Sequence, residues 1–540
     1  MPERLSDIAV EQHHGADLAI SRAPTGIVAF VGRTLKGPIN QPVSVHNFAD
    51  YQRVFGGLWQ PSMLSYAVEQ FFENGGRQAL LVRVVNGGCA PTLTLPGGGG
   101  GLQLRGIAPG SREHLRASVD YDGIAATAKD RFNLVLQRVR GAASELIEDQ
   151  EIFRRVSILP DGGRYIVDAL LESRLARATG PIPSARPDRS PPAVPGGLVG
   201  YTYANNDGDD GEPLTDYDII GSAQAGTGIF ALQAVPAFNM LCIPPLGREQ
   251  DVGASTLLVA SRFCRDHHAI LICDPPASWS SATAAIDGIR DWPFRADDAL
   301  MYFPRIIAHD RLRGRAEVFA PCGAIAGMLA RFDATAPLWS PVERDEVLLR
   351  PGLRPACTVS DNERARLAQL AINTLTATRV AHRLPHEART LAAGNAGATD
   401  WRYLAPRRLA QFIASSIERG TQWLLLAHSG PVAWQRVTAQ VEAFLATLDL
   451  EGAFPGSAPG ECYFVICDQR FNDRDARAEG RISFVYGFAA SRPGEFHSFL
   501  VSHARGQSSV RPVAVNRYTT SARRVGEEIE TGLLRGLSPQ

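Results

Sequence analysis

Apolar runs and amphipathic segments alternate near the start of the chain. The apolar run Ile27–Val31 ends at a glycine, which predicts a short buried strand. Ser62 can cap a helix whose apolar residues recur at helical spacing, and Gly75–Gly76 can end that helix. Ala79–Val85, interrupted only by Arg83, predicts another strand. This order of strand, helix and strand is typical of an α/β domain.

The pattern changes over residues 88–215. This range contains the glycine tract Gly97–Gly101, the proline-rich stretch Pro181–Pro195 and the acidic loop Asn205–Glu212. Alternating apolar and polar residues, as in Phe132–Val139, indicate strands between these loops. The range therefore predicts a β-rich domain that is inserted on the surface of an α/β domain.

Strands and helices alternate again after Asp216. Ser360 and Glu363 form a capping box at the start of one predicted helix, and a second helix begins at Pro406 and ends at Gly420. We expect residues 216–503 to form one large α/β domain together with residues 23–87. The predicted strands of this region are Phe238–Ile243, Ala269–Cys273, Leu300–Phe303, Trp423–Leu426, Tyr463–Cys467, Ile482–Phe488 and Phe496–Val501.

Both ends of the chain are more polar than its middle. Residues 1–22 contain one short apolar stretch, Ile8–Glu11, which could form a strand but has no partner nearby in the sequence. Residues 504–540 contain an extended stretch, Val510–Val515, and a weakly helical pattern at Val525–Leu537. We therefore expect an N-terminal arm and a C-terminal arm outside the folded domains.

Composition and charge exclude several classes of protein. The 540 residues carry a formal net charge of −1, with 45% hydrophobic and 21% charged residues. This balance argues against extensive disorder, and no bulk positive charge is available to bind nucleic acid or an anionic membrane. Arginine supplies almost all positive charge, because the only lysines are Lys36 and Lys129. The length favours three or four domains at roughly 150 residues each.

Neither a targeting segment nor a disulfide framework is predicted. The N-terminus lacks the apolar core of a secretory signal, and no run of 18 apolar residues could span a membrane. Eight cysteines are scattered along the chain without a CxxC pair. They are best interpreted as buried reduced thiols of a protein made in the cytosol.

The enzyme signatures that can be tested are incomplete. The tract Gly97–Gly101 and the glycines near Gly226 lack the lysine of a phosphate-binding loop. Asp274 and Asp468 follow predicted strands, where open α/β sheets place active sites, but no nucleophile elbow accompanies them. We interpret both aspartates as structural and predict no catalytic residue.

Metal sites are also weakly supported. His382 and His386 have the spacing of two ligands on one helix turn, but Pro385 between them would break that helix. The loop Asn205–Glu212 has oxygen ligands at alternate positions, yet its glycine is misplaced for a helix-flanked calcium loop and no glutamate occupies the twelfth position. We predict neither a metal nor another cofactor.

Several blocks of the sequence carry a more specific signal than its composition. They include TGIVAFVGRTLKGP and LSYAVEQFFENGGRQALLVRV near the start, GTGIFALQAVPAFNMLCIPP in the middle, and EARTLAAGNAGATDWRYLAPRRLAQFIASSIERGTQWLLLAHSGPVAW and CYFVICDQRFNDRDARAEGRISFVYGFAASRPGEF near the end. These blocks resemble contractile phage tail sheath proteins, follow the order expected for that family and sample both α/β parts.

The resemblance implies a structural subunit and not an enzyme. Sheath proteins form stacked hexameric rings around an inner tube, and their contraction drives the tube through a target envelope. The implied partners are further copies of this chain, an inner tube protein, baseplate and terminator or cap proteins, and sheath paralogues. The protein would be made in a bacterial cytoplasm and assembled into a virion tail or injection particle. The implied fold is a split α/β domain of subtilisin-like topology with an inserted outer domain and two arms.

Two sets of residues gain a predicted role from this resemblance. In the family the arms add strands to the sheets of neighbouring subunits, and either Phe496–Val501 or Val510–Val515 could be the exchanged C-terminal strand. The residues expected in such arms are Ile8, Ala9, Val10, Glu11, Phe496, Phe499, Val501, Val510, Val513 and Val515. The residues expected to form a basic face toward an acidic tube, unless they are solvated or paired within the chain, are Arg402, Arg407, Arg408 and Arg419.

Two other functions remain open. A non-polymerising cap or a sheath paralogue would share the family pattern but would not form the contractile polymer. A hydrolase of subtilisin-like topology would need Ser, His and Asp side chains that converge in one cleft. Hydrogen bonding near Asp274 and Asp468 distinguishes the hydrolase from the other two.

Overall fold

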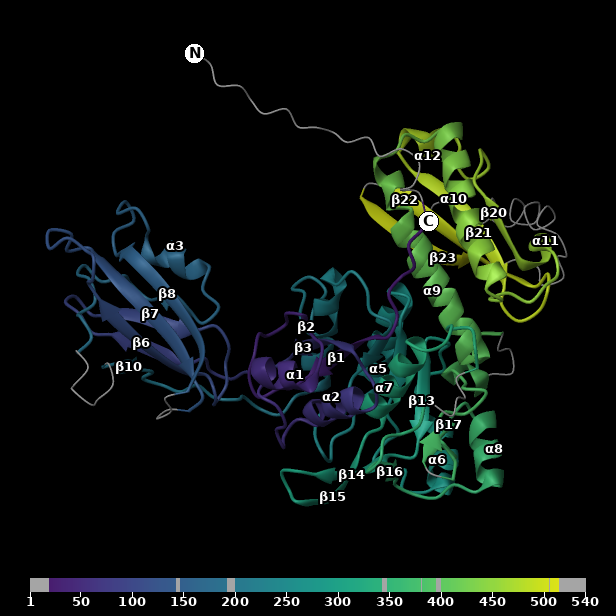
Figure 1. Cartoon of the computed structure of the whole chain (residues 1–540), viewed down its shortest axis with the longest axis horizontal. Helices are drawn as coiled ribbons and strands as arrows, with labels where there is room; N and C mark the ends of the chain where they lie inside the picture. The colour runs from purple at the N-terminus through teal and green to yellow at the C-terminus, as the bar shows by residue number, and fades with distance from the viewer. Residues whose placement is uncertain are drawn as a thin grey trace, which may run out of the picture.

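A computed structural model gives the structure of the chain, and Figure 1 shows three parts. A β-rich part on the left connects to a central α/β part, and the long helix α9 leads from the centre to a C-terminal part. The structure describes residues 19–513 except 142–145, 192–199, 342–346, 380, 395–399 and 505. The predicted strand Ile8–Glu11, Val515 and the predicted helix Val525–Leu537 lie outside these residues.

The central part is built on a sheet of seven strands in the order β17-β13-β12-β11-β1-β3-β2. All neighbouring strands are parallel except β2, which is antiparallel to β3. The strands are β1 (Ile27–Gly32), β2 (Val43–Val45), β3 (Gln78–Arg83), β11 (Met240–Cys242), β12 (Ile270–Cys273), β13 (Ala299–Phe303) and β17 (Asn373–Thr374). Because helices cover both faces of a parallel sheet, such strands are continuous apolar runs, and this is why the sequence predicted several of them.

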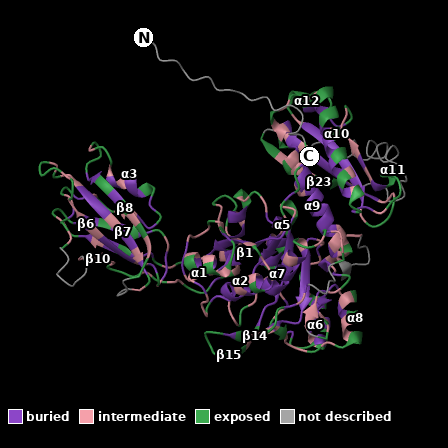
Figure 2. Cartoon of the chain, viewed as in Figure 1, coloured by how far each residue is buried: buried purple, intermediate pink, exposed green. Residues whose placement is uncertain are grey.

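Two hydrophobic cores enclose this sheet. Val28 and Phe30 of β1 belong to one core, and Ala29 and Val31 belong to the other. The helices against the first face are α1 (Phe48–Phe55), α2 (Met63–Glu73) and α7 (Cys322–Asp333). The elements against the second face are α4 (Asp216–Ile220), η1 (Gly228–Ala234), α5 (Ala254–Asp266), α6 (Ala282–Gly288), η2 (Ile289–Asp291) and α8 (Asp361–Gln369). Figure 2 shows the buried residues concentrated on the central strands and the helices beside them.

Smaller sheets and turns complete the central part. One antiparallel sheet has three strands, and two of them form the hairpin at the bottom of Figure 1. A second antiparallel sheet has two strands that follow later in the sequence. Their strands are β14 (Ile306–Asp310), β15 (Arg315–Phe319), β16 (Arg354–Pro355), β18 (Thr376–Ala377) and β19 (His382–Arg383). The short 3₁₀ helices η3 (Leu391–Gly394) and η4 (Asp400–Arg402) precede α9.

The β-rich part has its own core between two antiparallel sheets. Their strand orders are β10-β6-β7-β8 and β4-β5-β9, and neither sheet includes a described strand of the other two parts. The elements are β4 (Thr92–Leu95), β5 (Leu102–Gly106), β6 (His114–Asp120), β7 (Arg131–Val139), β8 (Ile147–Ser157), α3 (Ile166–Leu171), β9 (Ala176–Thr179) and β10 (Thr202–Tyr203). The predicted β-rich character of residues 88–215 is therefore present.

The C-terminal part has a four-stranded antiparallel sheet in the order β20-β21-β22-β23 and a core of its own. Its elements are α9 (Leu404–Gly420), η5 (Gln422–Leu426), α10 (Pro431–Leu450), α11 (Pro459–Cys462), β20 (Tyr463–Ile466), α12 (Arg474–Ala478), β21 (Ile482–Ala489), β22 (Phe496–Ala504) and β23 (Gln507–Val513). Residues 216–503, predicted as one α/β domain, thus contribute to separate sheets and cores. The predicted domain boundaries and the subtilisin-like topology remain predictions.

One predicted strand was wrong. Trp423–Leu426 lies in the 3₁₀ helix η5, which connects α9 to α10. Leu424 is buried, whereas Leu426 is 92% exposed, so this apolar run does not pack as a strand would. The Trp423 indole N–H donates a hydrogen bond of 2.9 Å to the Gln440 side chain on α10 and fixes the turn.

The close contact between α2 and α7 generates the first testable prediction. A Cβ atom added to Gly323 of α7 would lie 2.0 Å from the carbonyl oxygen of Ala67 on α2. Gly323→Ala must push the two helices apart, and we expect it to lower the free energy of unfolding by about 1–3 kcal/mol, measured by urea denaturation. Gly460→Ala in α11 is the matched control, because no heavy atom lies within 4 Å of its added Cβ. Equal stabilities of the two variants would contradict the tight helix contact.

Candidate functional site

The carboxyl end of the central sheet is where an open α/β fold would hold a ligand. The sheet order changes direction between β1 and β11. The cavity at this point has a volume of about 10 Å³, which is at the lower limit for one water molecule. The residues that line it are Gly32, Arg33, Ser62, Met63, Leu64, Leu214, Pro244, Pro245 and Leu246.

Hydrogen bonds hold this end of the sheet closed. The Ser62 hydroxyl, at the N-terminus of α2, donates to the carbonyl oxygen of Arg33. The Arg33 guanidinium donates bonds of 2.8 Å to the carbonyl oxygens of Asp210 and Gly211 in the acidic loop. The position that binds a ligand in many open α/β proteins is therefore occupied by the protein's own backbone and side chains.

Asp274 occupies the end of β12, as the sequence predicted. Its carboxylate accepts a 2.8 Å hydrogen bond from the backbone N–H of Cys322 at the start of α7. Burial raises the pKa of Asp274 to about 6. A cavity of about 120 Å³ lies beside it, lined mainly by apolar side chains together with Asp251 and Trp292. Asp274 thus joins β12 to α7.

Asp468 follows β20 and is held by its own loop. Partial burial acts to raise the pKa of Asp468, but hydrogen bonds from Arg470 outweigh it and lower the pKa. The Arg470 guanidinium donates through Nε and Nη2 at 2.9 and 2.7 Å. Among the described residues, neither Asp274 nor Asp468 is hydrogen-bonded to a serine or histidine side chain. This geometry gives no support to the hydrolase hypothesis.

The structure places the other residues considered in the sequence as follows. His382 lies in the short strand β19. Gly228 lies near the glycine Gly226 of the rejected phosphate-binding loop, and a Cβ added to it would lie 2.4 Å from the carbonyl oxygen of Ile219. That turn therefore requires glycine. Asp210 of the acidic loop accepts bonds of 2.9 and 2.7 Å from the N–H and hydroxyl of Ser111. Within the described ranges, no group of three or more His, Cys, Asp or Glu side chains could hold a metal ion. The eight cysteines, all in described segments, are free thiols, and five of them are buried.

The C-terminal sheet distinguishes the two candidate exchange strands. Phe496, Phe499 and Val501 lie in β22, which pairs with β21 on one side and β23 on the other. Val510 and Val513 lie in β23, the last described strand of the sheet, whose polar residues are mostly exposed. Pro512 also lies in β23, and proline is compatible with an edge strand. An added strand could therefore pair with β23, whereas both sides of β22 are already occupied.

The predicted basic face is not present as a unit. Arg407 and Arg408 are buried on α9, whereas Arg402 and Arg419 are exposed. Arg408 forms an ion pair with Asp333 of α7 in which both side chains are almost inaccessible to solvent. Arg407 lies 3.8 Å from a carboxylate oxygen of Asp297. The acidic partners lie far away in the sequence, so the spacing of arginines on α9 could not reveal that two of them are buried.

Solved structures of other proteins have a similar fold. No family profile matches the sequence, and no curated protein matches it in a sequence search. The structure is similar to a chain of the contracted PVC sheath complex from an extracellular contractile injection system, with a TM-score of 0.52 and 14% identity. That match covers 97% of this chain and 99% of the other.

Two crystal structures show the same similarity. A sheath tail protein from Listeria innocua has a TM-score of 0.56 and 10% identity, over 91% of this chain and 95% of its own. A sheath tail protein from Desulfitobacterium hafniense has a TM-score of 0.51 and 10% identity, over 94% and 99%. The chain has the fold of contractile sheath proteins. The resemblance found in the sequence blocks is thus confirmed for the fold.

Sequence reasoning missed a group of buried charges in this sheath fold. Arg83, 1% exposed, donates hydrogen bonds of 2.7 Å to the carbonyl oxygens of Gly37 and Pro109. Lys36 forms an ion pair with Glu148 of β8. The bond of Arg83 to Pro109 and the ion pair of Lys36 with Glu148 join the central part to the β-rich part. Two features of the sequence could have indicated these buried charges: Arg83 interrupts an apolar run, and lysine is rare in this chain.

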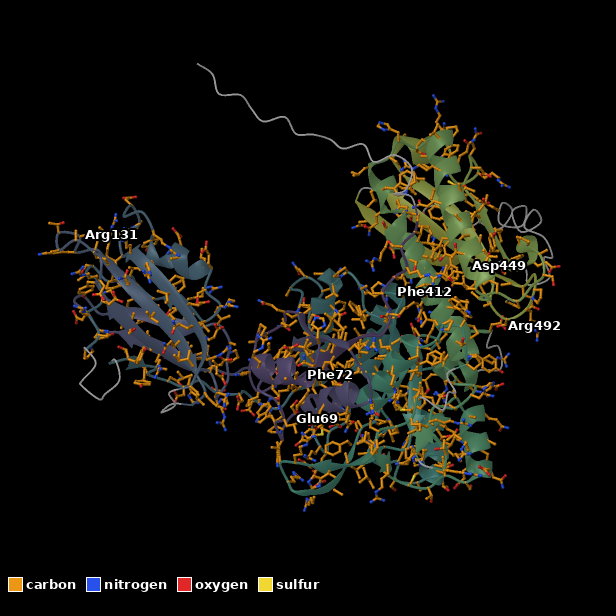
Figure 3. All side chains as sticks on the ribbon, viewed as in Figure 1. Glu69, Phe72, Arg131, Phe412, Asp449 and Arg492 are labelled. Atoms are coloured by element: carbon orange, nitrogen blue, oxygen red, sulfur yellow. The ribbon has the colours of Figure 1, made fainter. Side chains whose placement is uncertain are left out.

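A second polar junction joins the central and C-terminal parts. The Gln411 side chain on α9 donates a 2.8 Å hydrogen bond to the carbonyl oxygen of Ala269. His268 lies 3.2 Å from a carboxylate oxygen of Glu418. Phe412, labelled in Figure 3 where α9 leaves the central part, contacts Phe444 of α10 with 6.4 Å between ring centroids. Helix α9 is therefore bonded to both parts of the sheath fold.

The buried pair at this junction gives a second prediction. Arg408→Met leaves the Asp333 carboxylate buried without its cation, so we expect a loss of about 3–5 kcal/mol in unfolding free energy. Arg419→Met on the exposed part of α9 is the control and should change stability by less than about 0.5 kcal/mol. Chemical denaturation measures both. The double variant Arg408→Met with Asp333→Leu should recover most of the loss, and a failure to recover would show that the pair is not the cause.

A third prediction concerns Asp274. Its pKa of about 6 lies above the unfolded value of about 3.9, so its contribution to stability is full below about pH 4 and is lost as the pH rises through 6. Asp274→Asn stays neutral and should match or exceed the wild-type melting temperature at pH 7, with a flatter dependence between pH 4 and 6. Asp468→Asn should instead lower stability slightly at pH 7, because its pKa is lowered in the folded chain. Thermal melts between pH 4 and 7 measure both variants. A melting temperature of Asp274→Asn below that of the wild type at pH 7 would contradict the raised pKa of Asp274.

Proposed function

We propose that this chain is a structural sheath subunit of a contractile tail or injection machine. It polymerises as stacked hexameric rings around an inner tube and contracts to drive the tube through a target envelope. The match over 97% of this chain and 99% of a chain in the contracted PVC sheath complex carries the proposal. The matched proteins are sheath proteins, which supports a structural role for this chain.

The open edge of the C-terminal sheet supports assembly by strand addition. Strand β23 has a backbone edge that pairs with no other described strand. The arm residues Ile8–Glu11, outside the described segments, have the apolar character needed for an added strand. Such pairing links subunits through backbone hydrogen bonds, which persist while other surfaces repack. Interface differences of a few kcal/mol per subunit, summed over many copies, can drive contraction.

The partners in this proposal are further copies of the chain, an inner tube protein, and baseplate and terminator or cap proteins. The subunit is made in a bacterial cytoplasm and enters a tail or an injection particle. No helix in the described ranges is both long and apolar enough to cross a membrane. Of the four arginines considered for a tube-facing surface, only Arg402 and Arg419 are exposed enough to contact another protein.

One comparison favours a second candidate function. The chain is also similar to a chain in the contracted baseplate structure of the anti-feeding prophage, with a TM-score of 0.51 and 15% identity over 91% of this chain and 97% of the other. A sheath paralogue or cap that occupies one end of the particle would have the same fold. Only the extent of self-assembly separates this role from that of the main sheath subunit.

Electron microscopy of the purified full-length protein tests the proposal. The main sheath subunit should form long hollow cylinders with sixfold end views at high protein concentration. A cap or paralogue should form single rings or remain unassembled until other sheath components are added. A protein that is strictly monomeric under all these conditions would contradict a sheath role.

The fourth prediction concerns the N-terminal arm. Val10→Pro removes a backbone N–H from the expected strand and should abolish cylinder formation without changing the melting temperature of the unassembled subunit. Val10→Thr keeps a β-branched residue and the N–H, so it should still assemble. Sedimentation and negative-stain images of both variants measure the effect. Normal cylinders from Val10→Pro would show that this arm is not an exchanged strand.

A further inference from the structure

The first described residues are anchored to the C-terminal part before the chain enters the central sheet. Ile20 is 7% exposed and packs against the end of α9, where a Cβ added to Gly420 would lie 2.8 Å from its side chain. The backbone N–H of Ala23 donates a 2.9 Å hydrogen bond to the Ser416 hydroxyl on the same helix. In Figure 1 this purple segment leads from the C-terminal part to the central part.

The anchored segment lies near the start of β23. Gly420 is followed by Thr421, whose hydroxyl lies 2.9 Å from the His503 ring at the end of β22. The other nitrogen of that ring lies 2.7 Å from the hydroxyl of Ser508, the second residue of β23. The contact of Ile20 with α9 therefore places the start of the described chain close to the end of the sheet where β23 begins.

The outer edge of β23 offers a different surface on each face. One side of β23 pairs with β22, and no described strand pairs with the other side. Val510 packs against the hydrophobic cluster that also contains Ile20. The next residue, Arg511, falls on the opposite face, is exposed and forms no ion pair with a described residue. A strand added here would meet apolar side chains on one face and an unpaired cation on the other.

Residues 8–11 complement both faces of this edge. In an extended segment, Ile8 and Val10 fall on one face and Glu11 falls on the other. The two β-branched residues can extend the apolar cluster beside β23, while the Glu11 carboxylate can pair with Arg511 across the strands.

The chain that follows β23 is a poorer match for the same edge. Residues 516–524 are mostly polar, include three arginines and contain no β-branched aliphatic residue. A strand formed by these residues would bring further positive charge toward Arg511 and would add little to the apolar cluster. The N-terminal arm is therefore the better occupant.

The connection is long enough for this pairing within one chain. Seven residues, 12–18, separate Glu11 from the described segment, and such a connection spans at most about 29 Å. Strand β23 has seven residues and is about 23 Å long. Because the anchor lies near the start of β23, the shortest connection makes the arm antiparallel to β23. All neighbouring strands of this sheet are also antiparallel.

We propose that residues 8–11 of the unassembled subunit dock as a fifth strand on the outer edge of β23 in the same chain. A short connection gives the arm an effective concentration in the millimolar range at this edge. The arm therefore excludes the arms of other subunits when the protein is present at micromolar concentrations. The long edge of the C-terminal sheet stays covered until other contacts hold a neighbouring subunit close to it.

Docking within the chain would also regulate assembly. In a forming sheath, the arm of a neighbour would replace the subunit's own arm, as in domain swapping. Each β23 edge then holds one arm before and after the exchange, so strand pairing contributes little net free energy and premature polymerisation is slowed. This consequence rests on the proposed sheath function, whereas the docking concerns a single chain and does not.

Hydrogen exchange with mass spectrometry tests the docking on the full-length protein, at a concentration where light scattering shows single subunits. Val10→Asp places a charge on the apolar face of the arm and should raise the exchange rate of residues 507–513 about tenfold. Ala9→Asp is the matched control, because its carboxylate falls on the face of Arg511, and it should keep wild-type exchange. A four-residue edge strand detaches well below the melting temperature, so hydrogen exchange reports the docking and thermal unfolding does not.

A charge exchange identifies the two strands that pair. Glu11→Arg would bring two cations together and Arg511→Glu two anions, so each should raise the exchange rate of residues 507–513 about threefold at low salt. The double variant Glu11→Arg with Arg511→Glu restores opposite charges and should return the rate to near the wild-type value.

Three results would overturn the docking. The first is equal exchange of residues 507–513 in the wild type and Val10→Asp. The second is protection that grows with protein concentration, because the added strand would then come from another subunit. The third is faster exchange in Thr519→Pro but not in Val10→Asp, because the chain after β23 would then be the occupant. Absence of cylinders in electron microscopy would count against the sheath function alone, because docking is measured in single subunits.

Discussion

A β-sheet ends in two strands whose outer N–H and C=O groups need partners, and this constraint organises the whole chain. In the central sheet, the edge strands β2 and β17 are only three and two residues long, which leaves little backbone to pair with another protein. The C-terminal sheet is different, because its edge strand β23 spans seven residues with mostly exposed side chains. Of these two sheets, the C-terminal one therefore has the greater capacity for strand addition, and the β-rich part has a long edge strand of its own in β8.

The central part has an architecture that is common among enzymes. Its helices and parallel strands create the usual opening at the carboxyl ends of β1 and β11, but Ser62, Arg33 and the acidic loop close it. The buried charges Arg83 and Lys36 then join this closed end to Pro109 and Glu148 of the β-rich part. If the proposed sheath function holds, the polar junctions on both sides of the central sheet would let the chain move as one body.

The sequence could predict those features that depend on local pattern. Continuous apolar runs identified β1 and β3, and the Ser360–Glu363 capping box identified the start of α8. Features that depend on distant partners were missed or wrong. The sequence predicts Arg408 on the surface, because it does not show that Asp333 forms an ion pair with this residue. The sequence also predicts a strand at Trp423–Leu426, because it does not show the hydrogen bond from Trp423 to Gln440. The separate C-terminal sheet was missed for the same reason, because periodicity identifies strands but not the sheet in which they pair.

The central claim is that a sheath lattice forms by pairing strands between subunits at the open edges of the C-terminal sheet. A helical cryo-electron microscopy reconstruction of the assembled full-length protein, at a resolution that separates strands, tests it most directly. The account predicts that the sheet β20-β21-β22-β23 continues into strands from neighbouring subunits, with Ile8–Glu11 among them. A polymer in which every such sheet contains strands from one chain only would contradict it.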